Sequence, residues 1–206
     1  MKIYDIENFP NPIRVRMALA EKGATDQVAF VPVDVMGGEH RTDAFKAKNP
    51  SAAVPVLELD DGTFISECPA ITEYIDHAFD GPSLTGTTPK DRAYISMMQR
   101  RAETMVLDAV GAYFHHATPG LGPALEKNQN REWGLKQRDT ALNGMAYFDK
   151  VLEGQPFITG DDFSIADITL FAGLVFSDFA KIEVPAAYAN LKAWRERVAA
   201  RPSAGK

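Results

Sequence analysis

The chain has 206 residues, a formal net charge of −6 and one cysteine, and 45% of its residues are hydrophobic and 24% charged. These proportions are those of an ordinary soluble globule with one large or two small domains; the acidic balance argues against a nucleic-acid partner, and no apolar run is long enough to span a membrane. A single cysteine excludes an internal disulfide and a Cys-x-x-Cys pair, and the N-terminus lacks a signal core, so a cytoplasmic location is expected.

Strand and helix signals alternate over the first 80 residues. Four strands are expected, at residues 2–6, 28–33, 54–59 and 63–65. Three helices are expected, at residues 12–22, 42–48 and 69–79. The first has Asn11 as its N-cap and Pro12 at its first position, where the missing N–H costs nothing. This βαβ unit followed by ββα is the order of a thioredoxin-like domain.

Turn residues at positions 81–89 form a linker, and no strand is predicted beyond them. Four helices are expected there, at residues 90–118, 124–152, 168–179 and 191–200. The sequence therefore predicts an α/β domain over residues 1–80 followed by an all-helical domain over residues 90–206.

Three motifs stand out along the chain. Ser164-Ile165-Ala166-Asp167-Ile168 predicts a capping box, in which the Ser164 hydroxyl and the Asp167 carboxylate satisfy free N–H groups at a helix start. Earlier come Val54-Pro55-Val56-Leu57 and Ser66-Glu67-Cys68-Pro69-Ala70-Ile71. Their order and spacing resemble the cytosolic glutathione transferase family, of the bacterial or fungal type, over essentially the whole chain. The resemblance implies that the first domain binds glutathione and the second an acceptor.

The resemblance also implies how Val54, Pro55, His40 and Arg41 would meet glutathione. A cis Val54–Pro55 bond would let Val54 pair its N–H and C=O with the cysteinyl unit, as an added strand does. The alternative is a trans proline that begins an edge strand. His40, with Arg41 as second choice, would supply the cation for the glycyl carboxylate, unless both belong to an exposed charged loop.

Glu67 and Cys68 match the end of the site that takes the γ-glutamyl unit. Glu67 would accept from the ammonium group, and the Cys68 N–H at a helix N-terminus would receive the carboxylate. Cys68 replaces the usual Ser or Thr of the family. Its thiol is either a reactive group, activated by the helix N-terminus, or a small substitute without chemistry of its own.

The Tyr, Ser or Cys with which most family members stabilise the glutathione thiolate is missing here. Phe9 stands at the expected Ser position, and residues 5–24 contain no Ser, Thr or Cys. Asn11 is a candidate amide donor to the sulfur, although helix capping alone would also explain it. Tyr4 offers a hydroxyl, but it belongs to the first predicted strand.

The end of the first long helix offers another activating group. By the resemblance, His115 or His116 could hold a water or polarise the thiol, since imidazole titrates near neutral pH. Alternatively, both histidines cap the carbonyls of this helix end. The same region and the first helix would line the acceptor site through Phe9, Tyr113 and Phe114, unless these aromatics are simply core residues.

The sequence thus predicts a glutathione transferase that conjugates the glutathione thiolate to hydrophobic electrophiles, with glutathione as co-substrate and no metal. A homodimer is expected through the first long helix, at Arg100, Arg101 and Glu103, which could equally form a solvated face. The alternatives are a non-catalytic carrier of apolar ligands or interaction module, and a glutathione-dependent peroxidase or dehalogenase in the same site.

Overall fold

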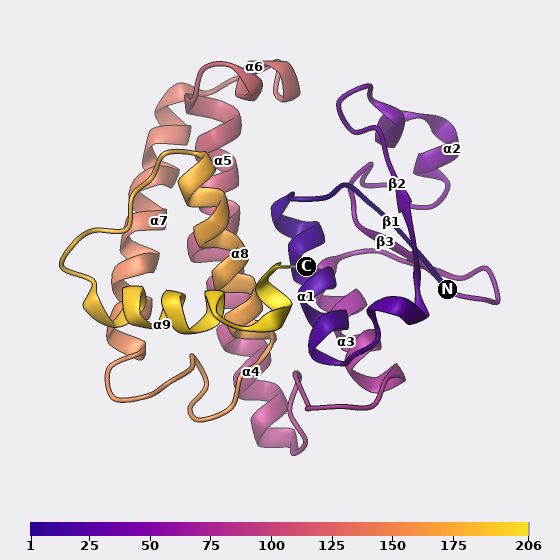
Figure 1. Cartoon of the computed structure of the whole chain (residues 1–206). Coiled ribbons are helices and arrows are strands. Elements are labelled where there is room, and N and C mark those ends of the chain that lie inside the picture. The colour runs from indigo at the N-terminus through magenta and orange to yellow at the C-terminus, as the bar shows by residue number, and fades with distance from the viewer. Residues whose placement is uncertain (206) are drawn as a thin grey trace. The chain divides into compact units, whose positions relative to one another are not determined.

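The computed structural model describes residues 1–205, which form two compact units. The first unit contains Met1–Leu84 and the C-terminal turn Pro202–Gly205, and the second contains Thr85–Arg201 (Figure 1). The first unit holds β1 (Lys2–Asp5), α1 (Pro10–Glu21), β2 (Ala29–Pro32), α2 (Asp43–Lys46), β3 (Val56–Glu58), β4 (Phe64–Ile65) and α3 (Cys68–Ala78). The second holds α4 (Pro89–Ala102), α5 (Asp108–Ala117), α6 (Leu121–Leu125), α7 (Arg131–Val151), α8 (Ile165–Phe179) and α9 (Ala189–Ala199).

The four strands of the first unit form one mixed sheet in the order β2-β1-β3-β4, in which β1 runs parallel to β2 and antiparallel to β3. Ile3 lies opposite Leu57, and both are buried. Because side chains alternate along a strand, Val56 points to the other face, where it packs with Phe45 of α2. Figure 1 shows α1 and α3 side by side on one side of the sheet. The predicted fold class, thioredoxin-like followed by all-helical, is confirmed.

Helix α1 begins earlier than predicted. Its N-cap is Phe9, Pro10 is its first residue, and no side chain caps it. The prediction that Asn11 caps this helix is therefore wrong, because Asn11 is already the second helical residue. Pro10 and Pro12 both fit the first turn, where backbone N–H groups have no partner inside the helix.

A buried ion pair joins the end of α1 to α3. Lys22 Nζ lies 3.0 Å from Asp76 Oδ1, and both side chains are almost fully buried. The same ammonium donates to the Pro82 carbonyl at 3.1 Å, and the Leu84 N–H donates to Asp76 Oδ1 at 2.9 Å. The pair thereby fixes the segment that follows α3 against α1 and α3 within the first unit.

The long helices of the second unit differ from the prediction at two places. The helix expected over 90–118 is divided into α4 and α5 by a π-helical turn at Glu103–Leu107. The helix expected from 124 starts only at Arg131, where Asn130 caps α7 by accepting from the Trp133 N–H at 3.0 Å. Among residues 1–205, no helix is both long and apolar enough to cross a membrane.

The predicted capping box at the start of α8 is confirmed. Asp167 is completely buried and accepts from the Ser164 N–H and hydroxyl, both at 3.0 Å. Its other oxygen accepts from the Ile158 N–H at 2.9 Å and from the Trp194 Nε1–H at 2.8 Å. Asp167 therefore connects α8, α9 and the preceding loop.

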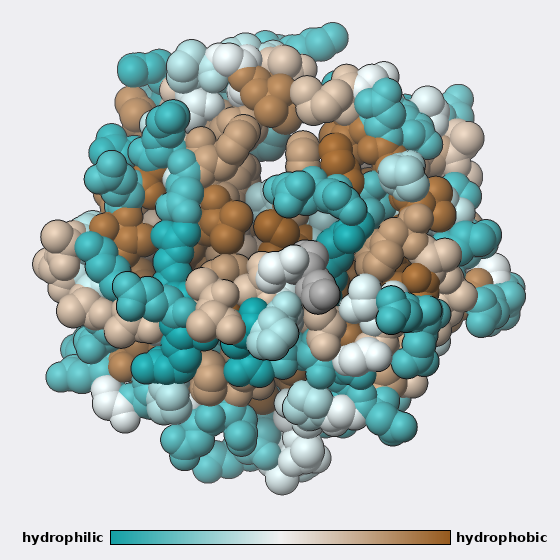
Figure 2. Space-filling model, in the orientation of Figure 1, coloured by the Kyte–Doolittle hydropathy of each residue, from teal (hydrophilic) through white to brown (hydrophobic). Residues whose placement is uncertain are grey.

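Hydrophilic residues cover much of the face drawn in Figure 2, with hydrophobic ones interspersed. The large hydrophobic side chains that are exposed are Met36, Phe64, Tyr94, Met97, Trp133 and Phe179.

Candidate functional site

The Val54–Pro55 peptide bond is cis, as expected. The loop before it is organised by Asn49, which is buried and was missed in the sequence analysis. Asn49 Nδ2 donates to the Ala53 carbonyl at 2.8 Å, and its Oδ1 accepts from the Ser51 N–H at 3.0 Å. Among residues 1–205, no backbone–backbone hydrogen bond outside helices and strands uses the N–H or C=O of Val54. The dipeptide of Asn49 with the following proline is a turn signal that could have identified it.

The start of α3 is shaped by an unusual backbone. Glu67, its N-cap, has φ +68° and makes no side-chain cap hydrogen bond. Such a conformation is uncommon for a residue with a side chain and is concentrated at functional sites. Cys68 is buried, and its Sγ–H donates to the Asn11 carbonyl at 3.5 Å. The thiol is thus directed at the first turn of α1.

Three side chains were considered for the sulfur end of the site, and they have different surroundings. The Tyr4 hydroxyl donates to Glu58, and this hydrogen bond, helped by burial, raises the pKa of Tyr4. Tyr4 is therefore occupied on the sheet. Phe9 packs against the same core cluster as Val54, which brings the start of α1 and the loop before β3 together. Asn11 is exposed, and its Oδ1 accepts from Arg14 Nη1 at 3.1 Å.

The two candidate cations at the glycyl end differ in their surroundings. His40 is buried, and its Nδ1 has no hydrogen-bond partner among the described residues. Burial lowers the pKa of His40, and the neighbouring charge of Arg41 lowers it further. His40 is accordingly neutral near pH 7, whereas Arg41 is exposed and carries a permanent charge.

The histidines at the end of α5 do not share one role. His116 Nδ1 accepts from the Asn130 N–H at 3.1 Å, and its ring stands edge-on to Trp133 at 4.9 Å. His116 therefore belongs to the junction between α5 and α7. Near the end of α5, the Phe114 carbonyl accepts from Thr118 at 2.6 Å and the His115 carbonyl from Gln129 at 2.7 Å. Among the described residues, neither histidine side chain donates to a carbonyl of this helix end, so the alternative in which they cap it is wrong.

His115 has no hydrogen bond or ion pair to its imidazole in the part of the chain that the structure describes. Its ring stands edge-on to Phe114 at 5.2 Å. Burial lowers the pKa of His115, and His116 lowers it further, against a small opposing effect of Glu126. The Phe114 ring is itself buried and also contacts Phe179, which is 62% exposed. Phe179 was missed because helix ends expose apolar residues without any sequence signal.

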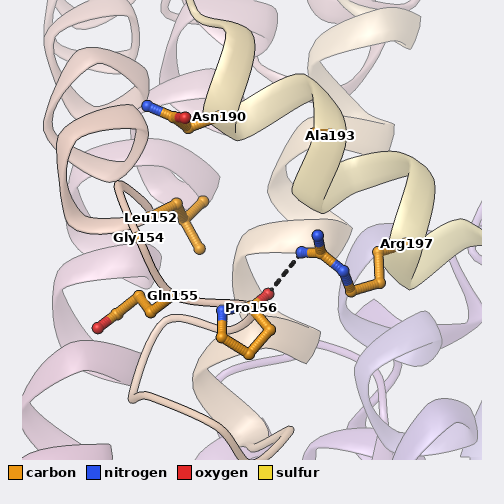
Figure 3. A pocket seen from close by; sticks show the side chains of 7 residues that line it. All are labelled: Leu152, Gly154, Gln155, Pro156, Asn190, Ala193 and Arg197. Atoms are coloured by element: carbon orange, nitrogen blue, oxygen red, sulfur yellow. Dashed lines mark hydrogen bonds between the residues drawn. The ribbon is translucent and has the colours of Figure 1, made fainter.

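A shallow cavity of about 380 Å³ lies in the second unit between the end of α7 and α9 (Figure 3). Its polar side chains already bind backbone carbonyls of the same unit: Arg197 binds Pro156 at 2.8 Å, and Gln155 and Asn190 bind carbonyls at 2.9 to 3.2 Å. This cavity contains none of the predicted site residues. The described residues also contain no group of three or more His, Cys, Asp or Glu side chains that could hold a metal ion.

A thioredoxin-like unit followed by a helical unit with a capping box defines a class, and comparison with known proteins identifies the family. Residues 10–78 match the model of the glutathione S-transferase N-terminal domain, and residues 104–202 that of the C-terminal domain. Glutathione S-transferase 2 of Saccharomyces cerevisiae is 56% identical over 100% of this chain and 88% of its own length.

Solved structures agree with this match. A glutathione S-transferase domain-containing protein of Marinobacter aquaeolei is 66% identical and superimposes with a TM-score of 0.96 over 98% of this chain and 99% of its own. The crystal structure of Gtt2 from S. cerevisiae is 55% identical, with a TM-score of 0.96 over 100% and 99% of the two chains. The chain belongs to the glutathione S-transferase family and is an enzyme of the glutathione transferase class, as predicted.

Proposed function

We propose that this enzyme catalyses attack of the glutathione thiolate on hydrophobic electrophiles, with glutathione as co-substrate and no metal. One observation carries the proposal. Within residues 1–205, the N–H and C=O of Val54 beside Pro55 make no backbone–backbone hydrogen bond outside helices and strands, and the helix that starts after Glu67 has no side-chain cap. A peptide with a free carboxylate could pair its backbone with the N–H and C=O of Val54 and accept hydrogen bonds from the N–H groups at the start of α3.

Glutathione would bind the first unit along its length. Its cysteinyl unit pairs with the N–H and C=O of Val54, in the manner of an added strand. Its γ-glutamyl carboxylate is received at the positive end of α3, by the N–H of Cys68, and its ammonium by Glu67. Its glycyl carboxylate pairs with Arg41, because Arg41 is charged at neutral pH, and the neutral His40 contributes at most a hydrogen bond.

For activation of the thiol we propose His115 rather than His116. The His116 imidazole is used in the α5–α7 junction, whereas the His115 imidazole has no partner among the described residues. A pKa below the ordinary value keeps His115 neutral at pH 7, so it can accept a proton from the thiol or hold a water that does. Asn11 is the second activating group, as a hydrogen-bond donor to the sulfur.

The acceptor would meet aromatic side chains. We assign Phe9, Tyr113 and Phe114 to this site and add Phe179, since it is exposed while in contact with Phe114. Aromatic surface of this kind favours an apolar electrophile.

We also propose that the protein is a cytoplasmic homodimer that acts in detoxification. Helix α4 exposes Tyr94 and Met97 at 44% and 38%, three positions apart and hence on one helical face. The neighbouring Arg101 donates to the Tyr147 hydroxyl at 2.6 Å, and Arg100 pairs with Glu103 at 2.8 Å. An apolar strip with charged neighbours suits a two-fold contact between copies.

Calorimetric titration with glutathione, with the ultraviolet absorbance of the bound thiolate followed against pH, tests the function. We expect binding with the thiol pKa well below that of free glutathione, and conjugation of chlorodinitrobenzene. Binding without a pKa shift or turnover would instead support the carrier, which Phe9 at the expected Ser position favours. Turnover of hydroperoxides or organic halides in place of conjugation would support the peroxidase or dehalogenase.

A further inference from the structure

The first turn of α1 has few groups that can donate a hydrogen bond. Pro10 and Pro12 have no N–H, and the N–H of Ile13 is used by the Phe9 carbonyl at 3.0 Å. Between residues 10 and 13, the remaining donors therefore belong to Asn11: its backbone N–H and its side-chain NH₂. A thiolate at this helix start would depend on them.

The carboxamide of Asn11 is held in one orientation. Arg14, one turn further along α1, is 97% buried, and its Nη1–H donates to Asn11 Oδ1 at 3.1 Å. A guanidinium has donors and no acceptor, so the amide oxygen must face Arg14 and the NH₂ group must face away. Among residues 1–205, that NH₂ group has no acceptor. The backbone carbonyl of Asn11 is fixed as well, because it accepts a hydrogen bond from the Cys68 thiol at 3.5 Å.

We propose that Arg14 is a positioning residue for thiol activation: it fixes the Asn11 carboxamide so that the NH₂ group donates to the sulfur of bound glutathione. This inference rests on the proposed function, because it requires glutathione with its sulfur at the start of α1. A rotated carboxamide would place its oxygen at the thiolate and oppose ionisation. Arg14 opposes this rotamer, since its Nη1–H would lose the Asn11 Oδ1 acceptor.

Other charged groups surround this turn. Glu67 lies at the start of α3, beside Cys68. On the β1 side, Arg16 is paired with Asp5 at 2.8 Å and with Glu7 at 3.5 Å. The competing explanation is that the positive charge of Arg14 lowers the thiol pKa directly, without Asn11, so the test must separate charge from orientation.

The test measures the pKa of bound glutathione, by ultraviolet thiolate absorbance, in the full-length variants Asn11→Ala, Arg14→Met, Arg14→Lys and the double variant N11A/R14M. One hydrogen bond to a charged group corresponds to about one pKa unit. We expect N11A and R14M each to raise the thiol pKa by about one unit, and R14K, which keeps a donor, by less than half of that. The double variant should shift no further than N11A alone.

The conjugation rate should follow the same pattern. In R14M, kcat/KM should fall about tenfold below the wild-type thiol pKa and approach the wild-type value above the raised pKa. The Kd for glutathione should stay unchanged when it is measured below the wild-type thiol pKa, where the bound thiol is protonated in both enzymes. A folded R14M enzyme with the wild-type thiol pKa would overturn the inference and leave the proposed function intact. Equal R14M shifts with and without Asn11 would also overturn it, since Arg14 would then act by charge. If the wild-type enzyme does not lower the thiol pKa, the proposed function itself fails.

Should R14M not fold, Arg14→Gln replaces it in the same cycle. Its amide keeps a neutral donor, so we expect a smaller shift that disappears in the N11A background. A shift that persists there would contradict the orientation role.

Discussion

Replacing Trp194 by Phe should destabilise the helical unit by an amount that depends on pH. Trp194 is completely buried on α9, and its Nε1–H donates to Asp167 at 2.8 Å. Losing a hydrogen bond to a buried carboxylate costs about 1.5–3 kcal/mol, and the smaller ring leaves a cavity that adds ~1 kcal/mol. We therefore expect a loss of about 3 kcal/mol at pH 7.5.

The pH dependence follows from the burial of Asp167. Desolvation raises the pKa of this carboxyl from 3.8 to about 6, against the opposing effect of its hydrogen bonds from Ile158, Trp194 and Ser164. Between these values the folded state binds more protons than the unfolded state, so Asp167 lowers stability as the pH rises. The full effect is ~3 kcal/mol, present above about pH 6 and absent below about pH 4.

At about pH 5 the folded carboxyl is mostly protonated, and Trp194 then donates to a neutral group. The loss caused by W194F should accordingly shrink to about 2 kcal/mol, since a neutral hydrogen bond contributes ~1 kcal/mol. Urea unfolding followed by far-ultraviolet circular dichroism at both pH values measures the difference from wild type, which cancels the other carboxylates. Trp133→Phe, at an exposed position, is the matched control and should change stability by less than ~1 kcal/mol. An equal or larger W194F effect at pH 5 would refute the reasoning.

His115→Ala should lower kcat at least tenfold at pH 7 without lowering Tm. In the wild-type enzyme, kcat should decline only at pH values below the ordinary titration range of histidine, because burial lowers the pKa of His115. His116→Ala should do the reverse, lowering Tm through loss of the Asn130 contact while kcat per folded enzyme is kept; the opposite pattern would exchange their roles. Lys22→Met should cost about 3–5 kcal/mol in urea unfolding, because it leaves Asp76 as a buried charge without its ammonium. The double variant with Asp76→Leu should recover most of that loss, and no recovery would show that the ion pair is not the source.

The parts of the fold that the sequence predicted correctly depend on short-range signals. The capping box at Ser164 and Asp167 is contained in four residues, and the two strands expected at 54–59 and 63–65 pair around a turn of three residues, 60–62. Their geometry depends on backbone groups next to the side chains, so local sequence is sufficient. The prediction of where α1 starts was wrong because two competing local signals, Asn11 and Pro10, lie side by side.

The sequence predicted the type and position of the candidate site residues, but not their hydrogen-bond partners or their charge. That Tyr4 is occupied by Glu58, and His116 by Asn130, depends on partners 54 and 14 residues away. No local pattern encodes such partners. The burial that keeps His40 neutral likewise results from packing, so the sequence could name two cations for one carboxylate but could not rank them by charge.

The division between α4 and α5 illustrates the same limit at the level of packing. Residues 90–118 have continuous helical signals, yet Glu103–Leu107 adopts a π-helical turn. Two distant glycines allow other helices to approach this turn: a Cβ on Gly144 would lie 2.5 Å from the Met105 carbonyl oxygen, and one on Gly173 would lie 3.1 Å from Val106. Gly144→Ala should therefore be strongly destabilising, although a helix interior ordinarily favours alanine over glycine. A thermal midpoint equal to or above wild type would contradict the close approach, and a lower one would indicate that tertiary packing overrides the local propensity.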